Sequence, residues 1–253
     1  MVSEVISRLD ESPRNGDAFG IALLDAFTGK NALEIIERDD GLLIVNQISI
    51  YFAPPDTWST PSRKAIEQAG GRVLDIGCGS GRHAIFLQEN KFDVIGLDTS
   101  PGALEVARRQ GLQSTFLGTP EKHLLTNPTY DTFLLMGNNL CLLGSLDYAP
   151  SMLHTLAHMA APKARIIGQG VDPYAIHDPL YLGYYERNRE KGNLPGQIRY
   201  RVRYKNIATP WFDYLYCSPH ELEQLTQGSD WRIDTLTQVE GEVFYIAILR
   251  KIT

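Results

Sequence analysis

The chain has 253 residues, of which 43% are hydrophobic, and this is enough to bury the core of one domain with an elaboration. Its 24 basic and 30 acidic residues give a formal net charge of −6, so there is no overall attraction to nucleic-acid phosphates or to an anionic membrane. The three cysteines, Cys78, Cys141 and Cys217, are odd in number and not at metal-ligand spacing. We therefore expect neither a disulfide framework nor a metal site.

The first 16 residues alternate charged and apolar side chains and lack the continuous apolar stretch of a secretory signal. The longest apolar segment, residues 133–146, is interrupted by Gly137, Asn138 and Asn139, and it is too short to span a membrane. We therefore expect a soluble cytoplasmic protein with no membrane partner. The sequence does not indicate an oligomeric state.

Residues 1–70 are predicted to form a cap of helical and hairpin elements. They contain an amphipathic helical pattern at 17–27, a hairpin signal at 39–41 and a helix start at 60–62, where proline follows a threonine. No regular alternation of strand and helix is present in this segment. It is predicted to form a wall of a substrate pocket.

From residue 72 onward, short β-branched or apolar runs alternate with amphipathic helical stretches, and this pattern is typical of a parallel sheet covered by helices on both faces. The expected strands are residues 72–76, 93–97, 113–117, 132–136 and 164–168, and the expected helices are 81–89, 102–110 and 149–159, with a turn at 161–163. The sequence thus predicts an α/β fold with a doubly wound, mostly parallel sheet.

The last part of the chain departs from this alternation in two ways. Residues 231–239 and 242–251 are two strand-like runs separated by the turn signal Glu240-Gly241, so they are expected to pair as an antiparallel hairpin and complete a seven-stranded sheet. Residues 172–218 are an insert between the fifth strand and a helix at 219–225. An insert at that point emerges where open α/β sheets bind ligands, so we interpret it as a substrate lid.

The most informative motif is the glycine-rich run that follows the first predicted strand. Residues 77–81 read Gly-Cys-Gly-Ser-Gly and lead into a helix, an arrangement that lets backbone amides approach a ligand. A dinucleotide fingerprint would need a third glycine at the sixth position, which is Arg82 here. Asp75, just before the first glycine, favours a cationic ligand such as S-adenosylmethionine (SAM) over a pyrophosphate.

A second acidic residue, Asp98, ends the second predicted strand about twenty residues beyond the glycine loop. A carboxylate at this place can bind the two hydroxyls of a ribose. The alternative is that Asp98 or Ser100 caps the helix that starts near Pro101.

Together these segments resemble motif I and the following acidic motif of the class I SAM-dependent methyltransferases, with a Rossmann-like fold and a returning antiparallel strand. The resemblance implies that the glycine loop contacts the methionine part of SAM, that Asp98 holds the ribose and that Glu121 contacts the adenine amino group. Asn138 and Asn139 follow the fourth strand, where they could bond the ammonium or carboxylate of SAM, or fill left-handed turn positions. The candidate cofactor-binding residues are Asp75, Gly77, Cys78, Gly79, Ser80, Gly81, Asp98, Thr99, Glu121, Asn138 and Asn139.

The general resemblance covers about residues 70–170 and the final hairpin. The first 70 residues and the insert are similar to those of bacterial methyltransferases of undefined substrate.

Within the insert, residues 197–205 alternate so that four basic residues lie on one strand face and two tyrosines and a valine lie on the other. A second strand at 211–216 could pair with this run. The basic face is either a solvated surface or a lining that attracts an anionic substrate. Tyr51 and Trp58 could close over SAM from the N-terminal side.

Methyl transfer from a sulfonium needs mainly positioning and exclusion of water, so a general base is optional. His177, flanked by Asp172 and Asp178, is the histidine predicted to act as a base, with an ordinary surface histidine as the alternative. Cys78 is interpreted as a loop residue and not a nucleophile, although a helix N-terminus could lower its pKa.

The predicted function is a SAM-dependent methyltransferase that acts on a nitrogen or oxygen of a small molecule. One alternative is an RNA methyltransferase that uses the basic strand to bind phosphates. A second alternative is a SAM-binding protein without catalysis. The sequence leaves the acceptor atom open.

Overall fold

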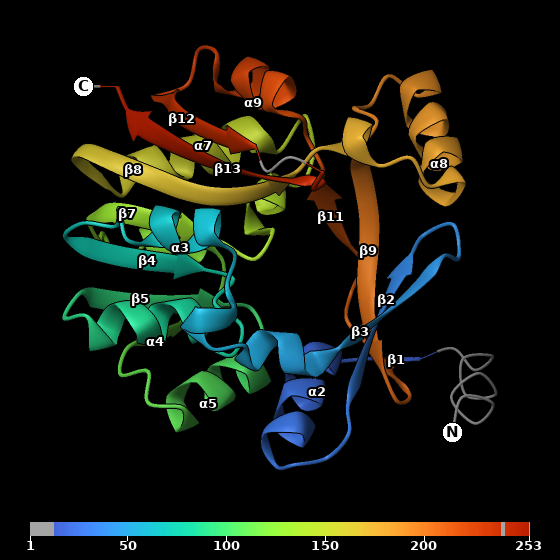
Figure 1. The fold of residues 1–253 in the computed structure, drawn as a ribbon, viewed down its shortest axis with the longest axis horizontal. Coiled ribbons are helices and arrows are strands. Elements are labelled where there is room, and N and C mark those ends of the chain that lie inside the picture. The colour runs from blue at the N-terminus through green and yellow to red at the C-terminus, as the bar shows by residue number, and fades with distance from the viewer. Residues whose placement is uncertain (1–12, 239–240, 253) are drawn as a thin grey trace.

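The computed structural model describes residues 13–238 and 241–252 (Figure 1). Most of the N-terminal segment considered for targeting, residues 1–12, lies outside the described residues, as does Glu240 of the predicted final turn. Among the described residues, none of the helices is both long and apolar enough to cross a membrane.

The larger of two sheets has seven strands in the order β12-β13-β8-β7-β4-β5-β6. Its strands are β4 (Arg72–Ile76), β5 (Asp93–Asp98), β6 (Thr115–Leu117), β7 (Tyr130–Leu135), β8 (Ala160–Val171), β12 (Trp231–Gln238) and β13 (Phe244–Lys251). Strands β4 to β8 are parallel, whereas β13 runs antiparallel to β8 and pairs with β12 as a hairpin. This main sheet confirms the predicted α/β fold, including the antiparallel end.

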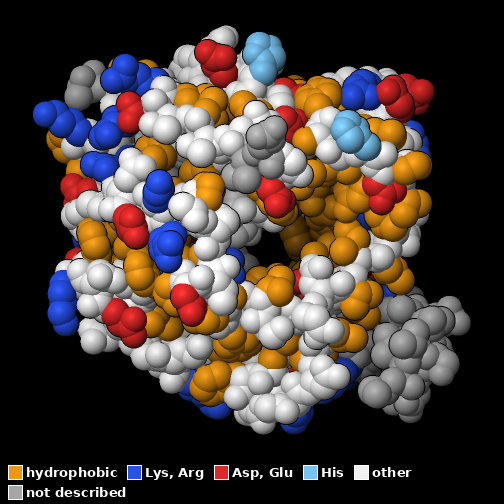
Figure 2. All heavy atoms as spheres, in the orientation of Figure 1, with side chains coloured by type: hydrophobic (Ala, Val, Ile, Leu, Met, Phe, Trp, Pro, Cys, Tyr) orange, Lys and Arg blue, Asp and Glu red, His pale blue; other side chains and the backbone are white. Residues whose placement is uncertain are grey.

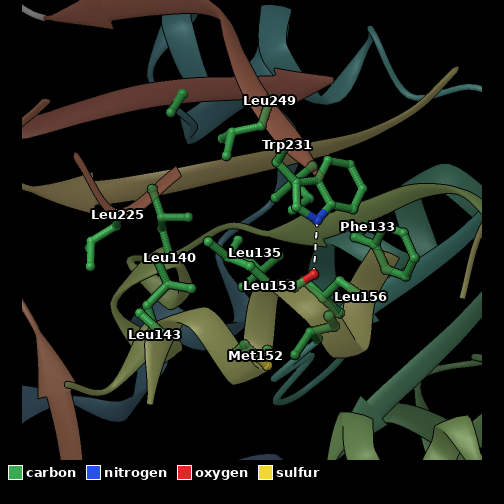
Figure 3. Close-up of a cluster of buried hydrophobic side chains, with 14 of the residues drawn as sticks. Phe133, Leu135, Leu140, Leu143, Met152, Leu153, Leu156, Leu225, Trp231 and Leu249 are labelled. Atoms are coloured by element: carbon green, nitrogen blue, oxygen red, sulfur yellow. Dashed lines mark hydrogen bonds between the residues drawn. The ribbon is translucent and has the colours of Figure 1, made fainter. Parts of the chain in front are cut away.

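Helices cover both faces of the main sheet. They are α3 (Thr60–Ile66), α4 (Arg82–Glu89), α5 (Pro101–Arg109), α6 (Pro120–Leu124), α7 (Ala149–His158) and α9 (Pro219–Thr226). Side chains of α3, α4 and α5 pack against one face, and those of α7 and α9 pack against the other. Figure 3 shows the second of these cores, where the indole N–H of Trp231 donates to the carbonyl of Leu153 at 2.9 Å and so satisfies the one polar atom of this large buried ring.

The turn predicted at residues 161–163 is wrong. The chain adopts a left-handed backbone at Lys163 (φ 64°) but stays within β8, and its register with β7 shifts between Tyr130 and Thr132. A bulge therefore absorbs the turn-forming residues Pro162 and Lys163. The third strand is also shorter than predicted, since it begins at Thr115 and not at Gln113.

A second sheet combines the N-terminal segment with the insert, which are far apart in the sequence. Its strands run in the order β1-β10-β9-β2-β3, and β11 pairs with the free end of β9. They are β1 (Arg14–Asn15), β2 (Leu33–Arg38), β3 (Leu43–Gln47), β9 (Gln197–Tyr204), β10 (Ile207–Ala208) and β11 (Phe212–Leu215). The other elements near this sheet are α2 (Ala18–Phe27), η1 (Ile48–Phe52), η2 (Pro55–Thr57), η4 (Pro173–Ala175) and α8 (Pro179–Glu190), whereas η3 (Asn139–Leu143) follows β7. The hairpin predicted around residues 39–41 and the pairing predicted within the insert are confirmed, but their joining into one sheet was not predicted.

Helix α2 fastens the second sheet to the main sheet. It crosses α5 so closely that a Cβ on Gly102 would lie 2.7 Å from the Cα of Gly20. The carboxylate of Asp17 accepts hydrogen bonds from the Ser100 hydroxyl at 2.7 Å and from the Gly102 N–H at 2.8 Å. Glycines at both contact positions thus permit the two helix backbones to touch, directly beside the end of β5.

Candidate cofactor and acceptor site

The glycine loop joins the end of β4 to the start of α4. Gly77, Gly79 and Gly81 all have left-handed backbones, with φ of 70°, 56° and 86°, which side-chain-bearing residues rarely adopt. A Cβ on Gly77 would lie 2.6 Å from the amide nitrogen of Asn139, whereas a Cβ on Gly79 would meet no heavy atom within 3.8 Å. The loop is therefore packed tightly at Gly77, whereas a Cβ at Gly79 would make only ordinary contacts with the rings of Phe19 and Tyr51, so no close neighbour blocks the backbone there.

Asp75 lies beneath this loop with one carboxylate oxygen unused. The residue is 1% exposed, and its Oδ2 atom has no hydrogen-bond partner among the described residues. Burial raises the pKa of Asp75 to about 7, repulsion from Asp98 adds to the shift, and Arg82 opposes it. A buried carboxylate oxygen without a donor is costly, and a cationic or N–H-bearing ligand would remove that cost.

Asp98 connects the end of β5 to the glycine loop. Its Oδ2 accepts the Gly79 N–H at 2.8 Å and its Oδ1 accepts the Ser100 N–H at 2.9 Å. Ser100 itself caps α5 by accepting the Ala103 N–H. The capping alternative thus applies to Ser100, and each Asp98 oxygen keeps a further lone pair for a hydroxyl group. Thr99 is exposed beside it.

The two asparagines after β7 have different surroundings. Asn139 donates from its amide to the carbonyls of Ile76 at 3.0 Å and Gly77 at 2.7 Å, so it braces the glycine loop. Asn138 adopts a left-handed backbone, with φ 69°, and its buried Oδ1 has no partner among the described side chains and backbone. The predicted turn role therefore fits Asn138, which also presents a free acceptor, while Asn139 acts on the loop.

The remaining candidate residues near the cofactor site are held by protein groups. Glu121, at the start of α6, accepts a hydrogen bond from the Tyr148 hydroxyl. Ser80 donates from its hydroxyl to the carbonyl of Tyr51. Cys78 is buried, and burial, with smaller contributions from nearby carboxylates, raises the pKa of its thiol well above the usual value. The neutral thiol agrees with the interpretation of Cys78 as a loop residue, and the helix N-terminus does not lower its pKa.

The second sheet provides a wall opposite the glycine loop. The ring of Tyr51 lies beside Gly79, 3.9 Å from its ideal Cβ position, and the Tyr51 hydroxyl donates to the carboxylate of Glu34 at 3.0 Å. The Tyr214 hydroxyl donates to the carbonyl of Asn138 at 2.7 Å. Figure 2 shows a deep hollow between the two parts of the molecule, with hydrophobic side chains along the side of the second sheet.

Comparison with known proteins finds a family match over the part of the chain that carries the glycine loop and Asp98. Residues 73–163 match the sequence profile described as "Methyltransferase domain". The chain is 35% identical over 107 residues to a ubiquinone biosynthesis O-methyltransferase from Azoarcus, which covers 39% of this chain and 43% of that protein. Residues 73–163 are therefore a methyltransferase domain, and the main sheet has the fold of the class I SAM-dependent enzymes. SAM is the cofactor of such a domain.

Solved structures extend the likeness to the second sheet at the level of fold. A SAM-dependent methyltransferase from Bacteroides fragilis in complex with S-adenosylhomocysteine has a TM-score of 0.80 and 24% identity, covering 94% of this chain and 95% of that chain. The CcbJ methyltransferase from Streptomyces caelestis has a TM-score of 0.57 and 18% identity over 79% of this chain and 99% of that chain. The alignment to the Azoarcus relative spans less than half of that protein's length.

The basic strand β9 turns its charges away from the methyltransferase domain. In the register of the sheet, Tyr200 lies opposite Phe212 of β11, so the tyrosines of β9 share a face with Tyr214, which contacts Asn138. Arg201 and Arg203, on the other face, bind Glu37 at 2.8 and 3.3 Å. Arg201 and Arg203 are thus paired with Glu37, and Lys205 with Asp25, while Arg199 is exposed on the same face as the two arginines, so the structure does not support the interpretation that these residues line the cleft.

Two other candidates have different surroundings. His177 is exposed between η4 and α8, and Asp172 and Asp178 cap the helices on either side. Trp58 packs edge-on against His83 and Phe86, with ring centroids 4.8 and 5.3 Å apart, and its closing over SAM stays a prediction.

Glu34 and Tyr214 were not identified as site residues from the sequence. Glu34 lies in an ordinary strand pattern, and its position in the site depends on the pairing of β2 with the distant strand β9. In the sequence, Arg82 was noted only as the residue that breaks the dinucleotide spacing. In the structure it donates to the carbonyl of Ile50 at 2.8 Å, and its positive charge opposes the rise in the pKa of Asp75. The only sequence signal for Tyr214 was the density of aromatic residues in the insert.

Proposed function

We propose that this protein transfers the methyl group of SAM to a nitrogen or oxygen of a small molecule held between the two sheets. The observation that carries the proposal is the meeting of two surfaces at Gly79. On one side are the glycine loop, which has no close neighbour at the Gly79 Cβ position, and the unused oxygen of Asp75, and on the other is the aromatic wall that begins at Tyr51. A donor and an acceptor can therefore meet within one enclosed space.

The proposed cofactor contacts follow from the chemistry of each group. The glycine loop would hold the methionine part of SAM, with Asp75 as the partner of its ammonium group because Oδ2 lacks a donor. Asp98 would accept hydrogen bonds from the ribose hydroxyls, and Glu121 would contact the adenine amino group. The Oδ1 atom of Asn138 is available for a further N–H of the cofactor.

Transfer itself would be an in-line displacement. The acceptor lone pair forms the new bond to the methyl carbon while the carbon–sulfur bond breaks, and its electron pair goes to sulfur to give S-adenosylhomocysteine. The role of the protein is to hold the two reactants in line and to exclude water. Helix α2 and the tyrosine face of the second sheet would provide that enclosure.

A small acceptor is supported by the charge of the wall and by one class of relative. Arg199, Arg201 and Arg203, which could bind a polymer's phosphates, lie on the face directed away from Tyr214, and the last two are paired with Glu37. The Azoarcus relative is named for ubiquinone biosynthesis, which is small-molecule chemistry. No structural observation favours the RNA alternative.

The test is a calorimetric titration with S-adenosylhomocysteine followed by turnover of SAM with a panel of phenols, aromatic amines and short RNAs. We expect micromolar cofactor binding and formation of S-adenosylhomocysteine with at least one small acceptor. Cofactor binding with no turnover on any acceptor would instead support the non-catalytic alternative. Tight RNA binding that weakens steeply with salt would support the RNA alternative.

A further inference from the structure

We propose that Glu34 selects the acceptor: its carboxylate binds a hydrogen-bond-donating group, so the acceptor is a neutral or cationic phenol or amine and not an anion. This inference rests on the proposed function and specifies its substrate class. It assigns a specificity role to a residue of the second sheet, outside the region that matches the methyltransferase family profile.

The first support is the position of Glu34. It lies on β2 directly opposite Asn46 of β3, and it shares the face of the second sheet that carries Tyr200 and Tyr214. Tyr51 contacts both Glu34 and the glycine loop. Its ring lies beside Gly79, and its hydroxyl is 3.0 Å from each carboxylate oxygen of Glu34. An acceptor ring held on this face of the second sheet, beside Tyr51, would therefore lie near Glu34.

The second support is unused hydrogen-bonding capacity. Glu34 is 2% exposed, and its side-chain hydrogen bonds come from Tyr51 and from the amide of Asn46 at 3.2 Å. A carboxylate has about four acceptor positions, so two donors leave room for another. Burial raises the pKa of Glu34, because the charged form loses its hydration. A protein retains a buried acid at such a cost most readily where a ligand compensates it.

The third support is the sign of the charge around this face. Arg38 shares the face with Glu34 but lies four positions further along β2, where it binds Asp40 at 2.7 Å and packs on the rings of Tyr181 and Tyr184, with its Nη1 left without a hydrogen-bond partner among the described residues. Arg201 and Arg203 occupy the opposite face with Glu37. On the side of the main sheet, Asp75 and Asp98 are both buried, and Arg82 is the cation near Asp75. An anionic acceptor would therefore meet carboxylates, while an amine or a hydroxyl would find an acceptor.

The test uses three ligands that share a phenol ring and differ in the charge of the tail: tyramine, 4-ethylphenol and 3-(4-hydroxyphenyl)propanoate. Each is titrated calorimetrically into the full chain saturated with S-adenosylhomocysteine. We expect tyramine to bind most tightly and the propanoate most weakly, about tenfold or more apart, and Glu34→Gln to reduce this difference to about threefold or less. Glu37→Gln is the matched control on the same strand and the opposite face, and it should keep the order of the wild type.

Glu34→Gln preserves size and hydrogen bonding to Tyr51, and thermal melting checks that it folds. Its affinity for S-adenosylhomocysteine should match that of the wild type. The inference is overturned if the propanoate binds as tightly as tyramine, if Glu34→Gln leaves the order unchanged, or if none of the rings binds the cofactor-loaded protein. Failure of the cofactor itself to bind the wild type would overturn the proposed function as well, so the two failures are distinguishable.

Discussion

The two sheets of this protein differ in how their function is encoded. The main sheet has its candidate cofactor residues in short local motifs at the ends of consecutive strands, such as Gly77 after β4 and Asp98 at the end of β5. The second sheet is assembled from segments so distant that the ion pair between Glu37 and Arg201 joins residues 164 positions apart. The comparison indicates that short sequence motifs specify the candidate cofactor site, whereas pairing between distant segments of the chain specifies the candidate acceptor site.

The largest effect is expected at the glycine loop. Gly79→Val would place a β-branched residue at φ 56°, and its side chain would extend toward the rings of Phe19 and Tyr51, which lie 3.8 and 3.9 Å from the ideal Cβ position. We expect SAM affinity to fall by about a hundredfold or more, while acceptor binding to the second sheet remains. Calorimetry measures the affinity, and circular dichroism verifies folding. A folded variant with normal SAM binding would show that the loop does not contact the cofactor.

The pH dependence of stability tests the buried acid of the same site. Because the pKa of Asp75 rises from 3.8 to about 7 on folding, the ligand-free protein binds more protons than the unfolded chain between these values. Stability should therefore fall as the pH rises from about 4 to about 7, by up to roughly 4 kcal/mol from this group. Asp75→Asn should remove that loss and weaken SAM binding.

Urea unfolding at pH 5 and pH 8 measures the difference for the wild type and the Asp75→Asn variant. We expect the variant to be more stable than the wild type at pH 8 and to show the smaller change between the two pH values. Equal pH dependence in both proteins would contradict the assignment of the penalty to Asp75.

A smaller effect is expected for Asp98→Ala. The substitution removes the acceptor of the Gly79 N–H and the proposed partner of the ribose. We expect SAM binding to weaken by about 1.5 to 3 kcal/mol, measured by calorimetry. Asp93→Ala, at the exposed opposite end of the same strand, is the control. Unchanged affinity in the Asp98 variant would refute the ribose assignment.

The smallest effect is expected where the two sheets touch. Tyr214→Phe removes the hydroxyl that donates to the Asn138 carbonyl and keeps the ring. We expect a loss of stability of about 1 kcal/mol and little change in SAM affinity, with a weaker affinity for the acceptor. Melting curves and the KM of the acceptor measure these effects. A large loss of SAM affinity would mean that the hydroxyl supports the cofactor site.

Local patterns were sufficient for most of the main sheet. The first strand begins and ends where the apolar run predicted, at Arg72 and Ile76, because both faces of that strand are buried. The turn signal at Pro162 and Lys163 failed because pairing with neighbouring strands held the chain in β8 through a bulge. Tertiary pairing overrode the local preference there.

The acceptor side could not be predicted in the same way. The register between β2 and β9 decides which face of each strand meets the methyltransferase domain, and no local sequence signal specifies a pairing over that separation. His177 was chosen for its residue type, and the structure leaves it exposed on a loop. Glu34 resembles any acid of a surface strand until that strand is paired.

The central claim, that the two sheets serve different ligands, is tested most directly by measuring S-adenosylhomocysteine affinity in Asp98→Ala and Glu34→Gln side by side. Both residues are buried acids, and they belong to different sheets. We predict about tenfold or greater weakening in the Asp98 variant and an affinity within about twofold of the wild type in the Glu34 variant. Equal weakening in both variants, or weakening in the Glu34 variant alone, would contradict this account.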